Sequence, residues 1–143
     1  MIMVDNIVIC KKLKQLASYY QELEQIATGQ TFDNYRKQIV TKRAVERDIQ
    51  LIVECATDIN NMILKQLSKG PAKDYFNSFI DLADNQVIEM DFALKLAPST
   101  GLRNILVHEY EKIDDQIVFK SITNVLTFYR QYLQVIAEYL GCK

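Results

Sequence analysis

The sequence predicts an all-α protein, an antiparallel helical bundle with three long helices and short additional helices. Three long segments repeat apolar residues every three or four positions, which is the spacing of one face of an amphipathic helix. No segment of convincing length alternates apolar and polar residues as a half-buried strand does. The 143 residues include only 4 glycines and 2 prolines, which lie between or after the apolar segments, where helices end. We therefore expect one helical domain over residues 1–143.

The first two long helices are marked by unbroken apolar stripes. The first stripe ends before Gly29, and the second segment runs from near Asp33 to the Gly70-Pro71 pair. A helix of that second length would extend about 50 Å at 1.5 Å per residue, which is longer than a compact domain needs. We expect a kink in it, or an end that projects toward a partner. The stripes are Ile9, Leu13, Leu16, Tyr20, Leu23 and Ala27, and then Val45, Ile49, Ile52, Ala56, Ile59, Ile63 and Leu67.

Two shorter helices follow, at 75–83 and at 87–97, and Pro98 stops the second of them. A further turn or two begins just beyond this proline. Ser99 or Thr100 is placed to cap it, because hydroxyl side chains accept hydrogen bonds from the first free N–H groups of a helix.

The last long helix is expected to begin with Asp114 or Asp115 as its N-cap and to end at Gly141. Its apolar residues again follow helical spacing, so this helix supplies the third face of the core. The stripe consists of Ile122, Val125, Tyr129, Leu133, Ile136 and Leu140.

Composition excludes several classes of protein. The formal net charge is −1, so the chain as a whole lacks the strongly basic character of many nucleic-acid-binding domains. With 49% hydrophobic and 24% charged residues, it is not an intrinsically disordered chain. The longest uncharged stretch, 121–129, is far shorter than the about 20 apolar residues of a membrane span. We expect no membrane segment and no secretory leader.

The three cysteines, Cys10, Cys55 and Cys142, are odd in number and far apart, and they form no C-x-x-C motif. This spacing argues against a disulfide framework and against a zinc knuckle. Reduced thiols in the cytoplasm fit the pattern best, so the protein is expected to be cytoplasmic.

The familiar enzyme motifs are missing. The chain has no phosphate-binding glycine loop, no dinucleotide fingerprint, no nucleophile elbow and no H-E-x-x-H pair, so no cofactor is expected. With one histidine, a His/Cys metal site is hard to build. Carboxylates near that histidine could bind a hard cation, but a solvated acidic loop with a helix cap is the favoured interpretation. They are Glu109, Glu111, Asp114 and Asp115.

The segment 101–110 concentrates the remaining reactive side chains. Arg103, Asn104, His108 and Tyr110 lie within eight residues, between apolar residues that anchor the segment. Asn104 and His108 share one helical face, and Arg103 lies at its edge. Spacing alone favours a structural cluster, in which the arginine forms a surface ion pair and the tyrosine lies at the bundle edge.

Arg103-Asn104-x-x-x-His108-x-Tyr110 resembles the R-x4-H-x-Y motif of the HepT toxins, members of the HEPN superfamily of helical ribonucleases. The similarity covers nearly the whole chain and includes 44–50, 84–88 and 113–115. It implies a HEPN-like domain and a metal-independent endoribonuclease toxin of a type VII-like toxin–antitoxin system. It further implies a homodimer whose motifs face across a cleft, and a minimal nucleotidyltransferase (MNT) as the antitoxin.

The chemistry of these residues suits RNA cleavage without a metal. The 2′-hydroxyl can act as nucleophile if one group removes its proton and another protonates the leaving 5′-oxygen. Histidine suits both roles, because its unperturbed pKa is near 6.5, and a two-fold dimer would supply His108 twice. Arg103 would stabilise the charge that develops on the phosphate. Asn104 is a supporting residue that would hold the imidazole or a phosphate oxygen.

Tyr110 has a separate role implied by the resemblance, since the partner in HepT/MNT pairs transfers AMP from ATP to the motif tyrosine. An added nucleotide brings bulk and negative charge into a cleft meant for RNA phosphates. A packing tyrosine is the alternative that the sequence leaves open.

The main local basic cluster consists of Arg36, Lys37, Lys42, Arg43 and Arg47. It would guide RNA or bind an acidic face of the antitoxin, although an ordinary charged helix face is the favoured interpretation. Two other functions remain open: a non-catalytic substrate-binding or adaptor subunit of a minimal nucleotidyltransferase, and a plain helical dimerisation protein.

Overall fold

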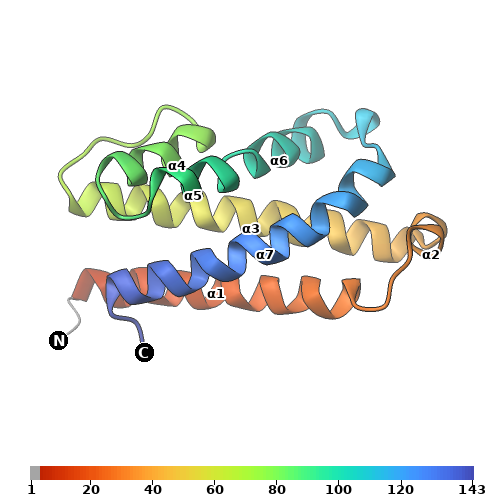
Figure 1. The fold of residues 1–143 in the computed structure, drawn as a ribbon, viewed down its shortest axis with the longest axis horizontal. Coiled ribbons are helices and arrows are strands. Elements are labelled where there is room, and N and C mark those ends of the chain that lie inside the picture. The colour runs from red at the N-terminus through yellow and green to blue at the C-terminus, as the bar shows by residue number, and fades with distance from the viewer. Residues whose placement is uncertain (1–3) are drawn as a thin grey trace.

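The computed structural model describes residues 4–143 and confirms the all-α prediction, with no strand in that range. Three long helices form the bundle shown in Figure 1: α1 (Val4–Ala27), α3 (Ile39–Gln66) and α7 (Asp115–Leu140). The shorter elements are α2 (Phe32–Lys37), α4 (Tyr75–Asp84), α5 (Met90–Leu96), α6 (Ser99–His108) and the 3-10 turn η1 (Tyr110–Lys112).

The helices surround one apolar core. Helix α3 packs against α1 on one side and against α4 and α6 on the other, while α7 crosses α1 and α3 (Figure 1). The predicted stripes supply the core, because their residues on the three long helices are almost all buried. Burial of this apolar surface is the main term that stabilises the bundle. The fully buried stripe residues include Leu16, Leu23, Val45, Ile49, Ile52, Ala56, Ile59, Ile63 and Ile136.

The long second segment is broken, as its predicted length suggested. Gln38 has an extended backbone (φ −110°, ψ 94°) and separates α2 from α3. Thr31 caps α2 through its hydroxyl, which accepts from the backbone N–H of Asn34 at 3.1 Å. The break lets α2 place Phe32 and Tyr35 against Phe119 of α7, with ring centroids 5.7 and 5.2 Å apart.

The caps of the last two helices differ in how well the sequence predicted them. The expectation that Ser99 or Thr100 caps α6 is wrong, because both hydroxyls donate to carbonyls three residues earlier, each at 2.7 Å. Pro98 already has helical angles (φ −59°, ψ −23°), so α6 follows α5 through a change of direction. Asp114 caps α7 and accepts from the N–H of Gln116 at 2.9 Å, and Gly141 ends the helix in the left-handed region.

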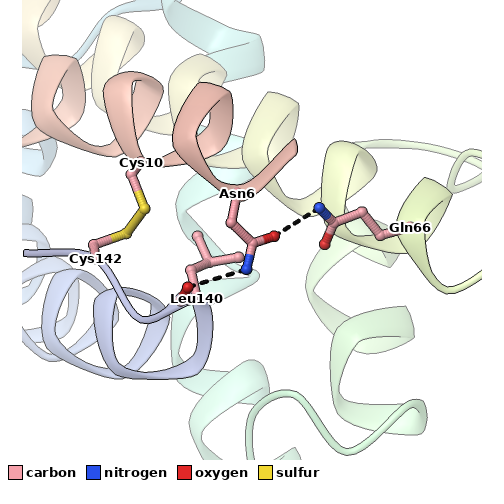
Figure 2. Close-up of a disulfide and its surroundings, with 5 residues drawn as sticks. All are labelled: Asn6, Cys10, Gln66, Leu140 and Cys142. Atoms are coloured by element: carbon pink, nitrogen blue, oxygen red, sulfur yellow. Dashed lines mark hydrogen bonds between the residues drawn. A yellow bond between two sulfur atoms is a disulfide. The ribbon is translucent and has the colours of Figure 1, made fainter. Parts of the chain in front are cut away.

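The cysteines contradict the expectation of three reduced thiols. Cys10 and Cys142 form a disulfide, with Cα atoms 5.7 Å apart (Figure 2). Their sequence separation of 132 residues hid the pairing, since only the packing of α1 against α7 brings them together. Cys55 is free and buried, and burial raises the pKa of its thiol to about 11.

The disulfide lies beside a polar link between the ends of three helices. Asn6 donates from Nδ2 to the carbonyl of Leu140 at 3.0 Å and accepts from Nε2 of Gln66 at 2.7 Å (Figure 2). The start of α1 and the C-terminus lie at this end of the bundle, whereas α2 and η1 lie toward the other (Figure 1). Within residues 4–143, the helices are all too short or too polar to cross a membrane.

Breaking the disulfide should destabilise the bundle without removing a core side chain. Cys142→Ser is expected to lower the free energy of unfolding by about 2–4 kcal/mol, because the bond restricts the unfolded chain over a long loop. Urea unfolding of the oxidised wild type and the variant measures the difference.

Reductant should reproduce this loss in the wild type and leave Cys142→Ser unchanged. Denatured, oxidised wild type should react with a thiol reagent at Cys55 alone. Three reactive thiols per chain, or a wild type indifferent to reductant, would contradict the disulfide.

Candidate active site

Helix α6 presents its polar residues on the surface. Thr100 and Leu106 are buried against the bundle, while Asn104 and His108 point to the exposed side. The helix ends at His108, and the chain then turns into η1. Because Leu106 anchors the helix in the core, its opposite face keeps a fixed orientation.

Arg103 is held by two neighbouring helices. Its Nε and Nη2 donate to the same carboxylate oxygen of Glu54 on α3, at 2.9 and 2.7 Å. The guanidinium lies over the ring of Tyr75 on α4, 4.6 Å from the centroid, and only 14% of the arginine side chain is exposed. Charge-assisted bonds and stacking together fix both the position and the plane of this cation. Its Nη1 side faces away from Glu54.

A buried network of hydrogen bonds supports Tyr75, the residue whose ring stacks on Arg103. Tyr132 on α7 donates to Asn60 at 2.7 Å, and Asn60 donates to the Ser78 hydroxyl at 3.0 Å. Ser78 in turn donates to the carbonyl of Tyr75 at 2.7 Å, which ties the first turn of α4 to the core. Each polar side chain in this network, those of Tyr132, Asn60 and Ser78, has a hydrogen-bond partner. The network therefore holds the backbone of Tyr75 in place and leaves none of its own polar groups unpaired.

Asn104 contacts the arginine and not the histidine. Its Oδ1 accepts from Nη1 of Arg103 at 3.4 Å, and no hydrogen bond connects it to His108. Both Asn104 and His108 are exposed, so the imidazole stands at the surface one helical turn beyond Asn104. Helix α6 thus carries a fixed cation and, at its C-terminal end, an accessible acid–base group.

Tyr110 lies just beyond the helix, on η1, and is half exposed. Its ring faces Arg43, near the start of α3, with the guanidinium carbon 5.2 Å from the ring centroid. Among the residues whose side chains the structure describes, 6–143, the contact of the Tyr110 side chain is this one with Arg43, and half of the tyrosine is exposed. Tyr110 is therefore not a core residue of this chain.

The predicted basic cluster divides into parts. Arg36 and Lys37 on α2 both pair with Asp33 at the surface, at 2.8 and 3.2 Å. Lys42 pairs with Asp115 of α7 at 3.0 Å. Two more arginines continue along α3: Arg43 pairs with Glu46 at 3.0 Å, while Arg47 is exposed and forms no ion pair with any described residue.

Three of the four acidic residues near the histidine have structural partners. Asp114 caps α7, Asp115 binds Lys42, and Glu109 contacts Lys112 at 3.5 Å. In the described part of the chain, no three His, Cys, Asp or Glu side chains come together as metal ligands would.

Three site residues escaped the sequence reasoning: Glu54, Tyr75 and Glu46. Glu54 carries one usable signal, because it lies on the same stripe of α3 as Arg43, Arg47 and Gln50, at steps of 4, 3 and 4. Polar residues that repeat at helical spacing on a long helix mark a face turned from the core. The sequence does not show that this face contacts Arg103 of α6, because that contact depends on how the two helices pack.

Residues 16–136 match the family described as ribonuclease HepT-like. The chain belongs to the HepT-like ribonuclease family. Its resemblance to the HepT toxins is thereby confirmed.

Two HepT-like relatives and one solved structure illustrate the similarity. A tRNA nuclease HepT of Aphanizomenon flos-aquae is 36% identical over 140 residues, which are 96% of this chain and 92% of the relative. An mRNA nuclease HepT of Shewanella oneidensis is 27% identical over 132 residues, 92% of this chain and 97% of the relative. A tri-AMPylated HEPN toxin of Shewanella oneidensis in complex with MNT antitoxin shares the fold, with a TM-score of 0.79 at 24% identity. That alignment covers 95% of this chain and 98% of the other.

Family membership and the two named nucleases confirm the expected enzyme class, an endoribonuclease. The ion pair of Arg103 with Glu54 thus connects the helix that carries the HepT motif, α6, to α3 in a protein of a ribonuclease family.

Removing the charge of Glu54 should slow RNA cleavage without unfolding the protein. Glu54→Gln frees the guanidinium of Arg103 to leave its position, so we expect about a tenfold lower rate, or ~1.4 kcal/mol in the barrier. The measurement is the single-turnover cleavage rate of bulk tRNA at saturating enzyme, which separates the rate from RNA binding.

Asp58→Asn is the matched control, since Asp58 lies one turn further along α3 and pairs with Lys12 on α1. If both variants cleave RNA at the wild-type rate, Glu54 does not position Arg103 for catalysis.

Proposed function

We propose that this HepT-like ribonuclease is a metal-independent toxin of a type VII-like toxin–antitoxin pair. We also propose that it acts in the cytoplasm, because RNA and ATP are available there; the reduced thiols expected from the sequence do not support this location, since Cys10 and Cys142 form a disulfide. The observation that carries the proposal is that one short helix holds both a cation fixed by α3 and α4 and, five residues further along, an exposed imidazole. Its RNA substrate belongs to the tRNA or mRNA class on which the named relatives act.

In the proposed reaction, the 2′-oxygen of the RNA forms a bond to the adjacent phosphorus. The bond from phosphorus to the 5′-oxygen breaks, and that oxygen leaves with a proton. One His108 removes the proton of the 2′-hydroxyl and a second supplies the proton to the leaving group. Arg103 binds the phosphate oxygens on which negative charge accumulates, and Asn104 supports it.

We propose a homodimer as the active form, because the reaction needs both a base and an acid while each chain has one histidine. A two-fold axis close to His108 would bring two imidazoles and two guanidiniums into one cleft. The open position of Asn104, His108 and Tyr110 on the surface supports this arrangement, since a second copy would have room to approach.

We propose that an MNT-type nucleotidyltransferase neutralises the toxin by adenylylating Tyr110. The Tyr110 oxygen would attack the α-phosphorus of ATP, forming a phosphodiester and releasing pyrophosphate, while the phenolic proton passes to a base of the transferase or to water. Half exposure of Tyr110 just after the motif helix supports this role. The AMPylated toxin of Shewanella oneidensis in its complex with MNT antitoxin offers the precedent.

The basic residues of α2 and α3 are proposed to contact RNA or the antitoxin. They are Arg36, Lys37, Lys42, Arg43 and Arg47. Those held in exposed pairs contribute less than Arg47, whose charge is not balanced by a described neighbour.

Cleavage of RNA in EDTA tests the catalytic assignment. We expect wild-type protein to cleave tRNA or mRNA without divalent ions, and Arg103→Ala and His108→Ala each to lose at least about a hundredfold in rate. Growth arrest on expression in a bacterium should disappear in parallel. Two variants that cleave and arrest growth like the wild type would exclude these residues from catalysis.

Mass spectrometry tests the modification. After co-expression with an MNT antitoxin, wild-type protein should gain AMP, and the modified peptide should contain Tyr110. Tyr110→Phe lacks the accepting oxygen and should gain nothing, while Tyr139→Phe, another exposed tyrosine, should be modified normally. Equal AMP mass on Tyr110→Phe would refute the assignment.

A further inference from the structure

Within the basic cluster of α2 and α3, Arg43 is the arginine that a buried carboxylate holds in place. Its Nη1 donates to both carboxylate oxygens of Glu46, at 3.2 and 3.0 Å. Glu46 lies one turn further along α3, and only 7% of its side chain is exposed, whereas 45% of the Arg43 side chain is. A buried carboxylate therefore holds an exposed guanidinium in place.

The buried charge of Glu46 is unfavourable unless the guanidinium of Arg43 stays beside it. Burial raises the pKa of Glu46, and the positive charge of Arg43 acts in the opposite direction. A buried charge without its partner is strongly unfavourable, so Glu46 restricts the positions that Arg43 can take. Surface pairs such as Arg36 with Asp33 lack this restriction, since both side chains are exposed.

The guanidinium is aimed at Tyr110. It lies 5.2 Å from the ring centroid, while its Nε and Nη2 have no hydrogen-bond partner among the described residues. Arginine presents five N–H donors, so those two nitrogens remain available to an anion. Because the guanidinium lies over the Tyr110 ring, a phosphate group bound by these free donors would lie beside this tyrosine.

We propose that Arg43, held by Glu46, forms a phosphodiester subsite beside Tyr110. An RNA backbone phosphate occupies it in the active protein, and the phosphate that joins AMP to Tyr110 occupies it in the neutralised protein. The second occupant rests on the proposed adenylylation of Tyr110. In both cases the ligand is a singly charged phosphodiester, so modification fills a position that RNA needs.

The test compares double variants that keep the net charge constant. Arg43→Gln with Glu46→Gln removes the cation and its buried partner together, which avoids an unpaired buried carboxylate. Arg130→Gln with Glu24→Gln is the matched control, because it removes an exposed Arg–Glu pair between α7 and α1. Circular dichroism and thermal unfolding confirm that each protein is folded, and Arg43→Lys restores the charge without the planar donor geometry.

The first arm measures RNA binding by unmodified protein. An RNA oligonucleotide with every 2′-hydroxyl methylated cannot be cleaved by the proposed reaction, so its dissociation constant is followed against salt concentration. Arg43→Gln/Glu46→Gln should lower the slope of log K against log salt by about one counterion, and the control should not change it.

The second arm measures protection of the adenylyl group. Protein adenylylated by an MNT antitoxin is treated with a phosphodiesterase, and AMP release is timed by mass spectrometry. Release from Arg43→Gln/Glu46→Gln should be about three- to tenfold faster than from wild type or control, as loss of a charge-assisted contact predicts.

A smaller salt dependence of RNA binding supports occupation of the subsite by an RNA phosphate. Faster release of AMP supports its occupation by the phosphate that joins AMP to Tyr110. If neither arm separates Arg43→Gln/Glu46→Gln from the control, the subsite is refuted. Wild-type protein that gains no AMP mass contradicts the proposed modification instead, and the first arm then decides the subsite by itself.

Discussion

The ion pair between Arg103 and Glu54 joins α6, the helix of the HepT motif, to α3, the longest helix of the bundle. Most of the arginine is shielded from water, so its charge needs a nearby partner, and Glu54 is the one that the fold supplies. Tyr75 then covers the face of the guanidinium. The consequence is a cation of fixed position and direction, which is what stabilisation of a developing phosphate charge requires.

Apolar periodicity predicts most of this fold because three long helices bury continuous stripes. It does not predict where chain segments far apart meet. The disulfide of Cys10 with Cys142 and the link of Asn6 to Leu140 and Gln66 depend on the packing of α1, α3 and α7. The prediction that Ser99 is an N-cap is wrong for a local reason. Pro98 already has helical backbone angles, so Ser99 lies within a helical turn and its hydroxyl donates to the carbonyl of Leu96.

The candidate site shows the same division. The motif on α6 can be predicted from the sequence, because its residues lie within eight positions and their order and spacing match a known pattern. Glu54 and Glu46 cannot, since a glutamate on a polar helix face looks like any solvated charge until the opposing residue is known. Their partners, Arg103 and Arg43, are two arginines that carboxylates of α3 hold near the motif. The disulfide joins the first half of α1 to the residue that follows Gly141 at the end of α7. Figure 1 shows the end of α7 at the opposite end of the bundle from η1.

Attack by the 2′-hydroxyl, assisted by Arg103 and His108, leaves product ends that direct attack by water does not leave. The most direct measurement is end-group analysis of RNA cut by the purified protein in EDTA. Transfer through the 2′-oxygen predicts a 2′,3′-cyclic phosphate on one fragment and a 5′-hydroxyl on the other. Fragments that carry a 3′-hydroxyl and a 5′-phosphate would contradict the account, because water would then have attacked the phosphorus in place of the ribose.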